Sequence, residues 1–485
     1  MSFNSIAFLI FLPSVLFLYW VFPRKAKKYF LLAASYFFYA YYNVWLLSLI
    51  INTTLISYLS ALMLSKTDNL KLKKTYMIVS VLLCLSVLFV FKYLNLFCFT
   101  GASILNFFGL NVSFAGFNLI LPVGISFYTF QTLSYVIDVY KEKVSYTKNI
   151  FIYAIYVTFF PQLVAGPIER PENLIPQLEN SKSINSEDVS EGIKYLLTGF
   201  VKKIVIADYV ATFVNTAFGS LSFNSPTYII GALLFSIQIY CDFSGYTDIA
   251  IGAARLFGVK LSKNFDHPYL SKSVREFWSR WHISLTSWFT DYIYIPLGGN
   301  RKGLLRQCLN IMLVFLVSGF WHGARWNFVL WGVINGLLIV IETLFNKYRN
   351  KSKVESNIVN ILKTCMTFLI ISFTWIFFRA QSVNDAFVII SNIFTNFDGG
   401  FSAAVDALSL NIYSLIYILF LIAVLVFIDY IPKINFVDNS TSSLRYINTE
   451  AKKYGIYVLV VILIALSWLY ISSINGGSGF IYFEF

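Results

Sequence analysis

The sequence predicts an all-α, polytopic membrane protein, and three observations support this prediction. Hydrophobic residues make up 58% of the 485 residues and charged residues only 13%, whereas about a quarter of an ordinary soluble protein is charged. Mean hydropathy is +0.68. Uncharged runs such as 8–21 and 412–428 approach the ~20 apolar residues that cross a bilayer as a helix, and such runs recur along the chain.

The net charge of +13 is divided among short Lys and Arg clusters that separate the apolar runs. A nucleic-acid-binding protein would gather its basic residues on one continuous face, so we expect no nucleic-acid partner. The clusters instead follow the rule that cytoplasmic loops are enriched in Lys and Arg. The five cysteines are widely spaced and lie mostly within apolar runs, which favours buried thiols over disulfides or metal ligands.

The basic clusters predict how the first spans alternate across the bilayer. No positive residue precedes the first apolar run and the cluster 24–28 follows it, which favours a retained helix with its N-terminus outside over a signal peptide. The following hairpin returns to the basic segment 71–74, and the fifth span returns to the lysines of 141–148. The five expected spans are 5–22, 29–46, 47–64, 75–98 and 117–138.

Regular alternation fails in the middle of the chain. Residues 166–195 are polar and contain three prolines, and the apolar segments after them contain charged residues. Charged or non-helical sequence is tolerated at membrane depth only where protein or a water-filled cavity lines it. We therefore expect re-entrant or broken helices around a cavity between about 120 and 335. The charged residues are Lys202, Lys203, Asp208, Asp242, Asp248 and Arg255.

The regular alternation of apolar runs and basic clusters resumes toward the C-terminus. A basic loop at 347–353 and the segment 433–453 are expected inside, and the C-terminus is expected outside. Together with the irregular middle, this gives about 11 transmembrane helices. The last expected spans are 359–378, 411–430 and 454–472.

The three histidines of the chain all fall in the irregular stretch: His267, His282 and His322. An imidazole at membrane depth is unfavourable unless it has a partner or a task, because hydrocarbon offers no water for its ring nitrogens. At about 1.5 Å per residue, a helix from Arg306 to His322 is about 24 Å long, which places His322 toward the outer half of the bilayer. Glycines at 319 and 323 permit close backbone approach beside it. The alternative for His322 is a structural histidine bonded to a backbone carbonyl. His267 precedes a proline and is interpreted as a turn residue.

His282 lies in the segment 277–292, whose apolar residues follow a helical period, with Arg280 on the opposite side. An interfacial helix anchored by tryptophan would give the same pattern, with His282 as a headgroup contact. The turn 297–303 is rich in glycine and contains Arg301, so it could seat phosphates, although it is not a P-loop.

A neutral imidazole in a poorly solvated pocket can accept a proton from a hydroxyl, which suits transfer of an acyl group to an alcohol. A Ser-His-Asp hydrolase is disfavoured because the chain contains no Gly-x-Ser-x-Gly sequence. A metal site is disfavoured because the spacing of the three histidines matches no local ligand pattern.

Six motifs in order closely resemble those of the membrane-bound O-acyltransferase family, in particular its bacterial alginate O-acetylation branch. The resemblance covers roughly residues 5 to 380. It implies a ring of tilted helices around a thin centre, with a tunnel between the two membrane faces. On this basis 1–485 is one integral-membrane domain, with N-terminal helices (1–115), a catalytic core (116–345) and C-terminal helices (346–485). The motifs are LPVGISFYTFQ at 121–131, FPQLVAGPI at 160–168, DFSGYTDIA at 242–250, EFWSRWHIS at 276–284, DYIYIPLGGNR at 291–301 and FWHG at 320–323.

The resemblance also implies functional residues. His322, in the Trp-His-Gly motif, corresponds to the catalytic histidine and His282 to a second functional position. We hypothesise that His322 is the general base and that His282 orients or polarises the thioester or the acceptor. The Trp321 indole would steady the developing oxyanion. Arg280 and Arg301 would hold an anionic donor near the cytoplasmic mouth.

The activity that the resemblance implies is transfer of an acyl group, with acetyl from cytoplasmic acetyl-CoA as the expected donor group, to a hydroxyl of an extracellular polysaccharide. No bound cofactor or metal is expected. The implied partner is a separate extracytoplasmic acetyltransferase, and the implied location is the bacterial plasma membrane.

Three alternatives stay open. D-alanyl transfer to teichoic acid from a carrier protein would use a similar fold, but such relatives are typically shorter, and the two spans after Arg379 favour the polysaccharide branch. A non-catalytic transporter of a polysaccharide precursor could use the same cavity, but it would need no imidazole at this depth. A scaffold for an envelope synthesis complex comes last, because it gives no reason to bury His322.

Overall fold

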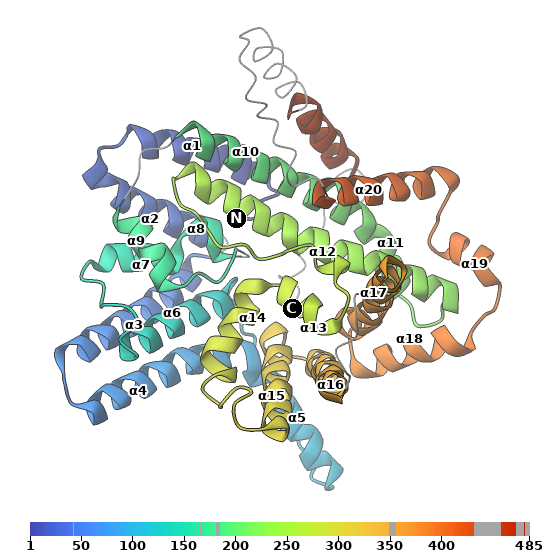
Figure 1. The fold of residues 1–485 in the computed structure, drawn as a ribbon, viewed down its shortest axis with the longest axis horizontal. Coiled ribbons are helices and arrows are strands. Elements are labelled where there is room, and N and C mark those ends of the chain that lie inside the picture. Colours follow the sequence, from blue (N-terminus) through green and yellow to red (C-terminus); the bar gives the residue numbers. More distant parts are fainter. Residues whose placement is uncertain are drawn as a thin grey trace.

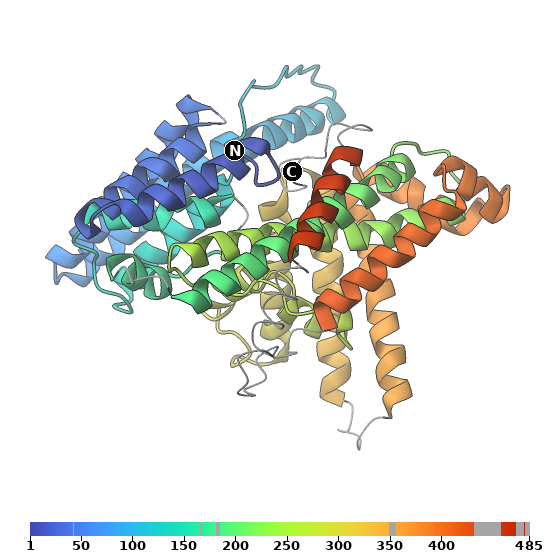
Figure 2. The ribbon, with the colours of Figure 1, turned by 90° about the horizontal axis from the view of Figure 1, so that it is seen from above.

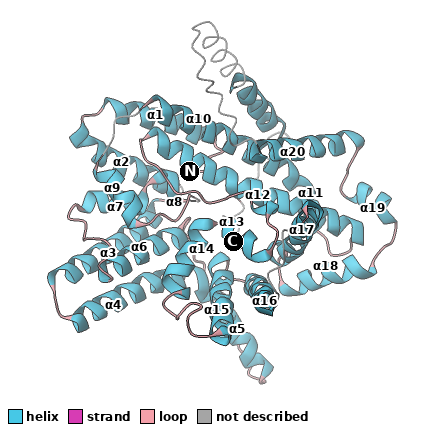
Figure 3. Ribbon diagram, viewed as in Figure 1, coloured by secondary structure: helices cyan, strands magenta, loops and turns pink. Residues whose placement is uncertain are grey.

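The computed structural model describes residues 1–41, 43–164, 166–180, 185–348, 356–430, 457–471 and 480. These residues form helices and connecting loops, and no strand occurs among them (Figure 3). The predicted all-α membrane fold is therefore confirmed. Figure 1 shows the helices arranged around a centre where the short α13 (Val274–Arg280) and α14 (Ile283–Phe289) lie.

The first four predicted spans each correspond to one helical stretch of the structure, but several boundaries differ. α4 continues through a π-helical turn at Phe89–Tyr93 into α5, so that one helical stretch runs over Leu70–Phe107 where 75–98 was predicted. The predicted 29–46 span begins earlier, at Arg24, because Pro23 ends the preceding turn. The helices are α1 (Ile6–Val21), α2 (Arg24–Ala40), α3 (Leu47–Lys66), α4 (Leu70–Leu88) and α5 (Leu94–Phe107).

The middle of the chain contains many short helices, as the sequence predicted. The long helices there are α12, α15 and α16. Two π-helical turns occur, at Val201–Ala207 and Thr290–Tyr294. The predicted 117–138 span begins only at Ile125, after Gly124 at φ +73°. The remaining helices are α6 (Ile125–Tyr140), α7 (Ile150–Thr158), α8 (Phe160–Leu163), α9 (Pro171–Glu179), α10 (Ser186–Phe200), α11 (Asp208–Phe218), α12 (Ser225–Leu256), α15 (Leu304–His322) and α16 (Trp326–Tyr348).

The C-terminal region has more helices than the sequence predicted. In Figure 2, α16 and α17 lie side by side and project from the body of the molecule. Two helices, α18 and α19, fill the stretch between the spans predicted at 359–378 and 411–430, and the segment 433–453 lies outside the described residues. The helices are α17 (Asn357–Arg379), α18 (Val383–Thr395), α19 (Gly400–Ala407), α20 (Ile412–Tyr430) and an unlabelled helix, Tyr457–Ile471.

Seven helical stretches of the described chain are long and apolar enough to cross a bilayer. This supports a membrane protein, but it does not confirm the predicted count of about 11 helices. Further apolar helices, such as α1 and α18, have only 10–17 residues and are shorter than the ~20 residues of a perpendicular span. The seven stretches are Val44–Lys66, Leu70–Phe107, Ser225–Leu256, Leu304–His322, Trp326–Lys347, Asn357–Arg379 and Ile412–Asp429.

Close backbone packing of α10 against α12 organises the middle of the molecule. Added Cβ atoms at Gly199 and Gly245 would lie 2.6 and 2.8 Å from each other's carbonyl oxygens, and Gly192 and Gly252 meet in the same way. Glycines let membrane helices approach this closely because no side chain separates the backbones. The contact places the basic residues that follow α10 directly against the acidic residues of α12.

Those charged residues form a buried ionic network, as expected for charges inside apolar segments. Lys203 Nζ lies 2.8 Å from an oxygen of Asp208 and 2.6 Å from one of Asp242. Lys202 Nζ lies 2.9 Å from Asp248 and 3.7 Å from Asp429. The network joins the π-helical turn after α10 to α11, α12 and α20, so these charges are paired inside the protein.

Candidate functional site

His322 is the last residue of α15, and the residue is 4% exposed. Three aromatic rings surround it edge to face, with centroids 5.0 Å away for Trp321, 5.0 Å for Trp331 and 5.3 Å for Phe378. The next residue, Gly323, is extended and ends the helix. A Cβ at Gly319 would lie 2.5 Å from the backbone carbonyl oxygen of Phe328, which is the close backbone approach expected there, whereas a Cβ at Gly323 would overlap the Phe328 ring.

A lysine that the sequence analysis missed holds the end of α15. Lys92 Nζ donates to the carbonyl oxygen of Trp321 at 2.6 Å and to that of His322 at 3.4 Å, and also to Ser126 Oγ at 3.2 Å. Tyr93 donates its hydroxyl to the Phe320 carbonyl at 2.8 Å. A cation is favourable at a helix C-terminus, where unpaired carbonyls concentrate negative charge. The available signal was a single lysine inside the apolar stretch predicted as a span, at the point where the helix becomes π-helical.

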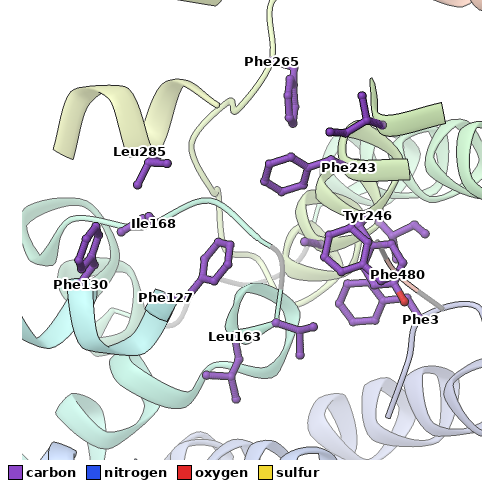
Figure 4. Close-up of a cluster of buried hydrophobic side chains, with 14 of the residues drawn as sticks. Phe3, Phe127, Phe130, Leu163, Ile168, Phe243, Tyr246, Phe265, Leu285 and Phe480 are labelled. Carbon is purple, nitrogen blue, oxygen red and sulfur yellow. The ribbon is translucent and has the colours of Figure 1, made fainter. Parts of the chain in front are cut away.

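His322 and Lys92 both line a cavity of about 80 Å³. The first of the six motifs supplies much of its wall, through residues 121–127, and Val164 and Trp321 complete it. Figure 4 shows Phe127 of this motif in the same buried cluster as Phe243 of α12. The cavity therefore combines an imidazole, an ammonium group and apolar walls.

His282 begins α14 and adopts a left-handed backbone conformation, with φ +46° and ψ +53°. Its side chain is 1% exposed. Burial lowers the pKa of His282 to about 3, so the ring is neutral at physiological pH.

The hydrogen bonds around Asn264 determine which nitrogen of His282 carries the proton. Asn264 Oδ1 accepts from the Ser284 backbone N–H at 3.2 Å and from Ser284 Oγ at 2.9 Å. An atom that accepts from a backbone N–H must be the amide oxygen, so His282 Nδ1, which lies 3.1 Å from it, donates. The neutral ring then keeps a lone pair on Nε2, which makes no hydrogen bond within the described residues.

Asn264 also connects motifs that are distant in the sequence. It is fully buried, and its backbone carbonyl accepts from the Ile283 N–H at 2.9 Å. Ser284 Oγ in turn accepts from the Ile168 N–H at 3.0 Å. The second and fourth motifs therefore meet at this asparagine, and no sequence pattern identified it.

Trp321 lies between the two histidines. Its ring centroid is 5.7 Å from that of His282 and 5.0 Å from that of His322. Its indole Nε1 is buried and has no hydrogen-bond partner in the part of the chain that the structure describes. The structure thus brings together the three residues that the sequence analysis placed at the centre of the site.

The two arginines proposed to hold a donor are not part of the His322 cavity lining. Arg280 pairs with Glu276 on the same helix at 2.6 Å, and Arg301 is an exposed residue of the turn 297–303. His267 is the turn residue that was predicted, with φ +48° immediately before Pro268. Among the described residues, no group of three His, Cys, Asp or Glu side chains has the arrangement of a metal site.

These features define an integral membrane protein whose buried site is built from two histidines and the indole between them. The sequence model of the membrane-bound O-acyltransferase family matches residues 31–382, and the chain belongs to that family. It is therefore a membrane-bound O-acyltransferase, an enzyme that transfers an acyl group from a donor to a hydroxyl.

Individual relatives agree with this assignment. The probable alginate O-acetylase of Pseudomonas putida is 37% identical over 388 residues, which cover 80% of this chain and 79% of the relative. The peptidoglycan O-acetyltransferase of Helicobacter pylori is 35% identical over 426 residues, with 81% and 79% covered. The teichoic acid D-alanyltransferase of Bacillus subtilis is 28% identical over 285 residues, with 54% and 70% covered.

Proposed function

We propose that this protein moves an acetyl group from a cytoplasmic thioester, acetyl-CoA, across the membrane for O-acetylation of an extracellular polysaccharide. The observation that carries the proposal is the buried row His282, Trp321 and His322 beside a cavity, which provides proton-accepting groups shielded from bulk solvent. The two O-acetyltransferase relatives, named for alginate and peptidoglycan, favour acetyl as the acyl group and a glycan polymer as the final acceptor.

In the proposed reaction, His322 removes the proton of an acceptor hydroxyl as its oxygen attacks the thioester carbonyl. The new ester C–O bond forms, the C–S bond breaks, and the thiolate leaving group takes up the proton. The free indole N–H of Trp321 supplies a donor for the developing oxyanion. His282 Nε2 carries a lone pair, so we assign it to accept a hydrogen bond from the acceptor hydroxyl rather than to polarise the thioester.

The wider setting of the reaction also belongs to this proposal. Arg280 and Arg301 would attract the phosphates of the donor from outside the cavity. The partner would be a separate extracytoplasmic acetyltransferase, which would carry out the final transfer to the polysaccharide. The protein would lie in a bacterial plasma membrane with both termini outside, and it would need no bound cofactor or metal ion.

The choice between acetyl and D-alanyl can be decided by the ester formed. We expect membranes containing the protein to transfer label from acetyl-labelled acetyl-CoA to polymer, as an ester that mild alkali releases as acetate. Parallel membranes would receive D-alanine linked to a carrier protein, and His322→Gln membranes would give the background. Alkali-released D-alanine with no labelled acetate would overturn the acetyl assignment in favour of the activity named for the Bacillus subtilis relative.

We expect Asn264 to act as a positioning residue for His282. Asn264→Leu removes the acceptor of the Nδ1 proton and should lower kcat by about 10–100-fold, the usual effect of losing the partner that orients a functional histidine. Asn264→Asp places a carboxylate against His282, which raises the pKa of His282 because an opposite charge favours the protonated ring. As the pH is lowered, the activity of Asn264→Asp should therefore be lost at a higher pH than the activity of the wild type.

Asn327→Leu is the matched control for this prediction. Asn327 is 1% exposed and donates to the carbonyls of Phe377 and Ala380, and its amide nitrogen makes these bonds away from both histidines. Its replacement should reduce thermal stability without moving the pH–rate profile. A profile that is the same for Asn264→Asp as for the wild type would show that Asn264 does not control His282.

A further inference from the structure

A cavity of about 540 Å³ lies at the turn between α1 and α2, apart from the residues that surround the histidines. Its walls come from this turn, the start of α7, the end of α9 and the loop after α12. Four cations line it, and we call it the basic cavity. They are Arg24, Lys25, Lys27 and Lys28.

The charge of the basic cavity is not balanced by the protein. Glu179 is the acidic residue of its lining, and none of the four cations forms an ion pair with a carboxylate in the described part of the chain. Lys27 Nζ instead lies over the rings of Trp20 and Tyr19, at 4.0 and 4.8 Å from their centroids. Like charges gathered around a concave surface favour the binding of an anion.

The walls of the basic cavity are held together by hydrogen bonds between distant parts of the chain. Trp20 Nε1 donates to the Leu256 carbonyl at 3.1 Å and so joins α1 to the end of α12. The Gln177 side chain donates to the Lys260 carbonyl at 3.0 Å and accepts from the Lys260 N–H at 2.8 Å. The cavity is therefore formed before any ligand binds, as is usual for ligand sites.

The lining of the basic cavity combines cations with apolar residues. The apolar lining residues, which we call the apolar base, include Leu31, Ile152, Ile155 and Phe257. Beside it, α1 exposes large apolar side chains, with Phe17 at 69% and Val21 at 67%. Aromatic residues with adjacent lysines, such as Trp20 and Lys27, are typical of the boundary between hydrocarbon and lipid headgroups. A soluble anion would need the four cations but not the apolar base.

The basic cavity also lies near other segments that the charge pattern places on the cytoplasmic side. Asn149, which follows the basic segment 141–148, is part of its lining. Lys73 of the segment 71–74 pairs with Glu142 at 2.9 Å. Anionic phospholipids attract basic groups at this surface.

We propose that the basic cavity binds the phosphate-bearing headgroup of an anionic phospholipid, with the phosphate among the four cations and the glycerol and first methylenes against the apolar base. The site is independent of acyl transfer and takes no part in the reaction proposed above. The bound lipid would hold the α1–α2 turn against α7, α9 and the end of α12.

The test is thermal unfolding of the detergent-purified protein in the presence of added phosphatidylglycerol or phosphatidylcholine. We expect phosphatidylglycerol to raise Tm and phosphatidylcholine to leave it unchanged. The variant Lys25→Gln/Lys28→Gln should bind phosphatidylglycerol about 25-fold more weakly, since each basic group near an anionic lipid surface contributes about fivefold in affinity. The matched control is Lys71→Gln/Lys74→Gln, which removes the same charge from α4, outside the cavity, and should bind like the wild type.

Two further additions distinguish the lipid from a soluble phosphate compound. Inorganic phosphate and coenzyme A are each titrated alone and in competition with phosphatidylglycerol. If either soluble compound raises Tm and displaces the lipid, the site recognises a soluble anion and the lipid proposal is wrong. Equal effects of the two phospholipids, or equal affinity of the cavity variant and the wild type, would also overturn it.

Discussion

Replacing His322 with glutamine should lower the rate of acyl transfer by about 10²–10⁴-fold, the contribution typical of a general base. Glutamine fills much of the same space but cannot accept a proton. The three rings around His322 do not depend on its protonation, so we expect the fold to remain intact. The measurement is labelled ester formed per milligram of purified protein, together with Tm for each variant.

His267→Gln is the matched control for this experiment. It makes the same chemical change at a turn residue outside the cavity, so its activity should stay near that of the wild type. If His322→Gln retains normal acylation with a normal Tm, His322 is not the base and the mechanism fails. A transporter would need no imidazole at this depth, so loss of acylation in His322→Gln with a normal Tm is the result that favours the enzyme over the transporter.

The sequence predicted the helices whose boundaries depend on local signals. The spans expected at 5–22, 47–64, 359–378 and 411–430 agree with α1, α3, α17 and α20 to within a few residues. Long apolar runs are sufficient there, because hydrocarbon requires every backbone group to be bonded within its own helix. The helices α18 and α19 were missed because, with 13 and 8 residues, both are shorter than the ~20 residues by which a membrane span is recognised.

The candidate site was predictable only in part. His282, Trp321 and His322 lie in recognisable motifs, and the structure brings their rings together. Lys92 and Asn264 act through contacts with distant or irregular segments. Lys92 lies 229 residues before Trp321, whose carbonyl accepts its hydrogen bond. The two residues meet only because the end of α15 lies beside the π-helical turn Phe89–Tyr93 in the folded protein. Hydrophobic periodicity contains no information about this pairing.

The buried ionic network should have the largest effect on stability. Lys203 is 1% exposed and pairs with both Asp208 and Asp242. Lys203→Met leaves two carboxylates without their shared cation in a poorly solvated interior. We expect a loss of about 3–5 kcal/mol in the free energy of unfolding, the usual cost of removing one partner of a buried pair. Denaturant unfolding in a fixed detergent would measure it.

Lys194→Met provides the comparison for Lys203→Met. Lys194 pairs with Glu191 at the surface of α10, at 2.7 Å, and loss of an exposed pair should change stability by less than about 1 kcal/mol. Equal losses for the two variants would show that Lys203 contributes no more than an ordinary surface charge.

A triple variant separates the loss of charge pairing from the loss of packing. Lys203→Met/Asp208→Asn/Asp242→Asn removes the cation and both carboxylates that depend on it, while keeping side chains of similar size. It should recover part of the stability lost in Lys203→Met, because the uncompensated charges are gone. If the triple variant is no more stable than the single one, the network stabilises this region through the shape of its side chains. Recovery would instead show that the charges of the π-helical turn and α12 need one another inside the membrane protein.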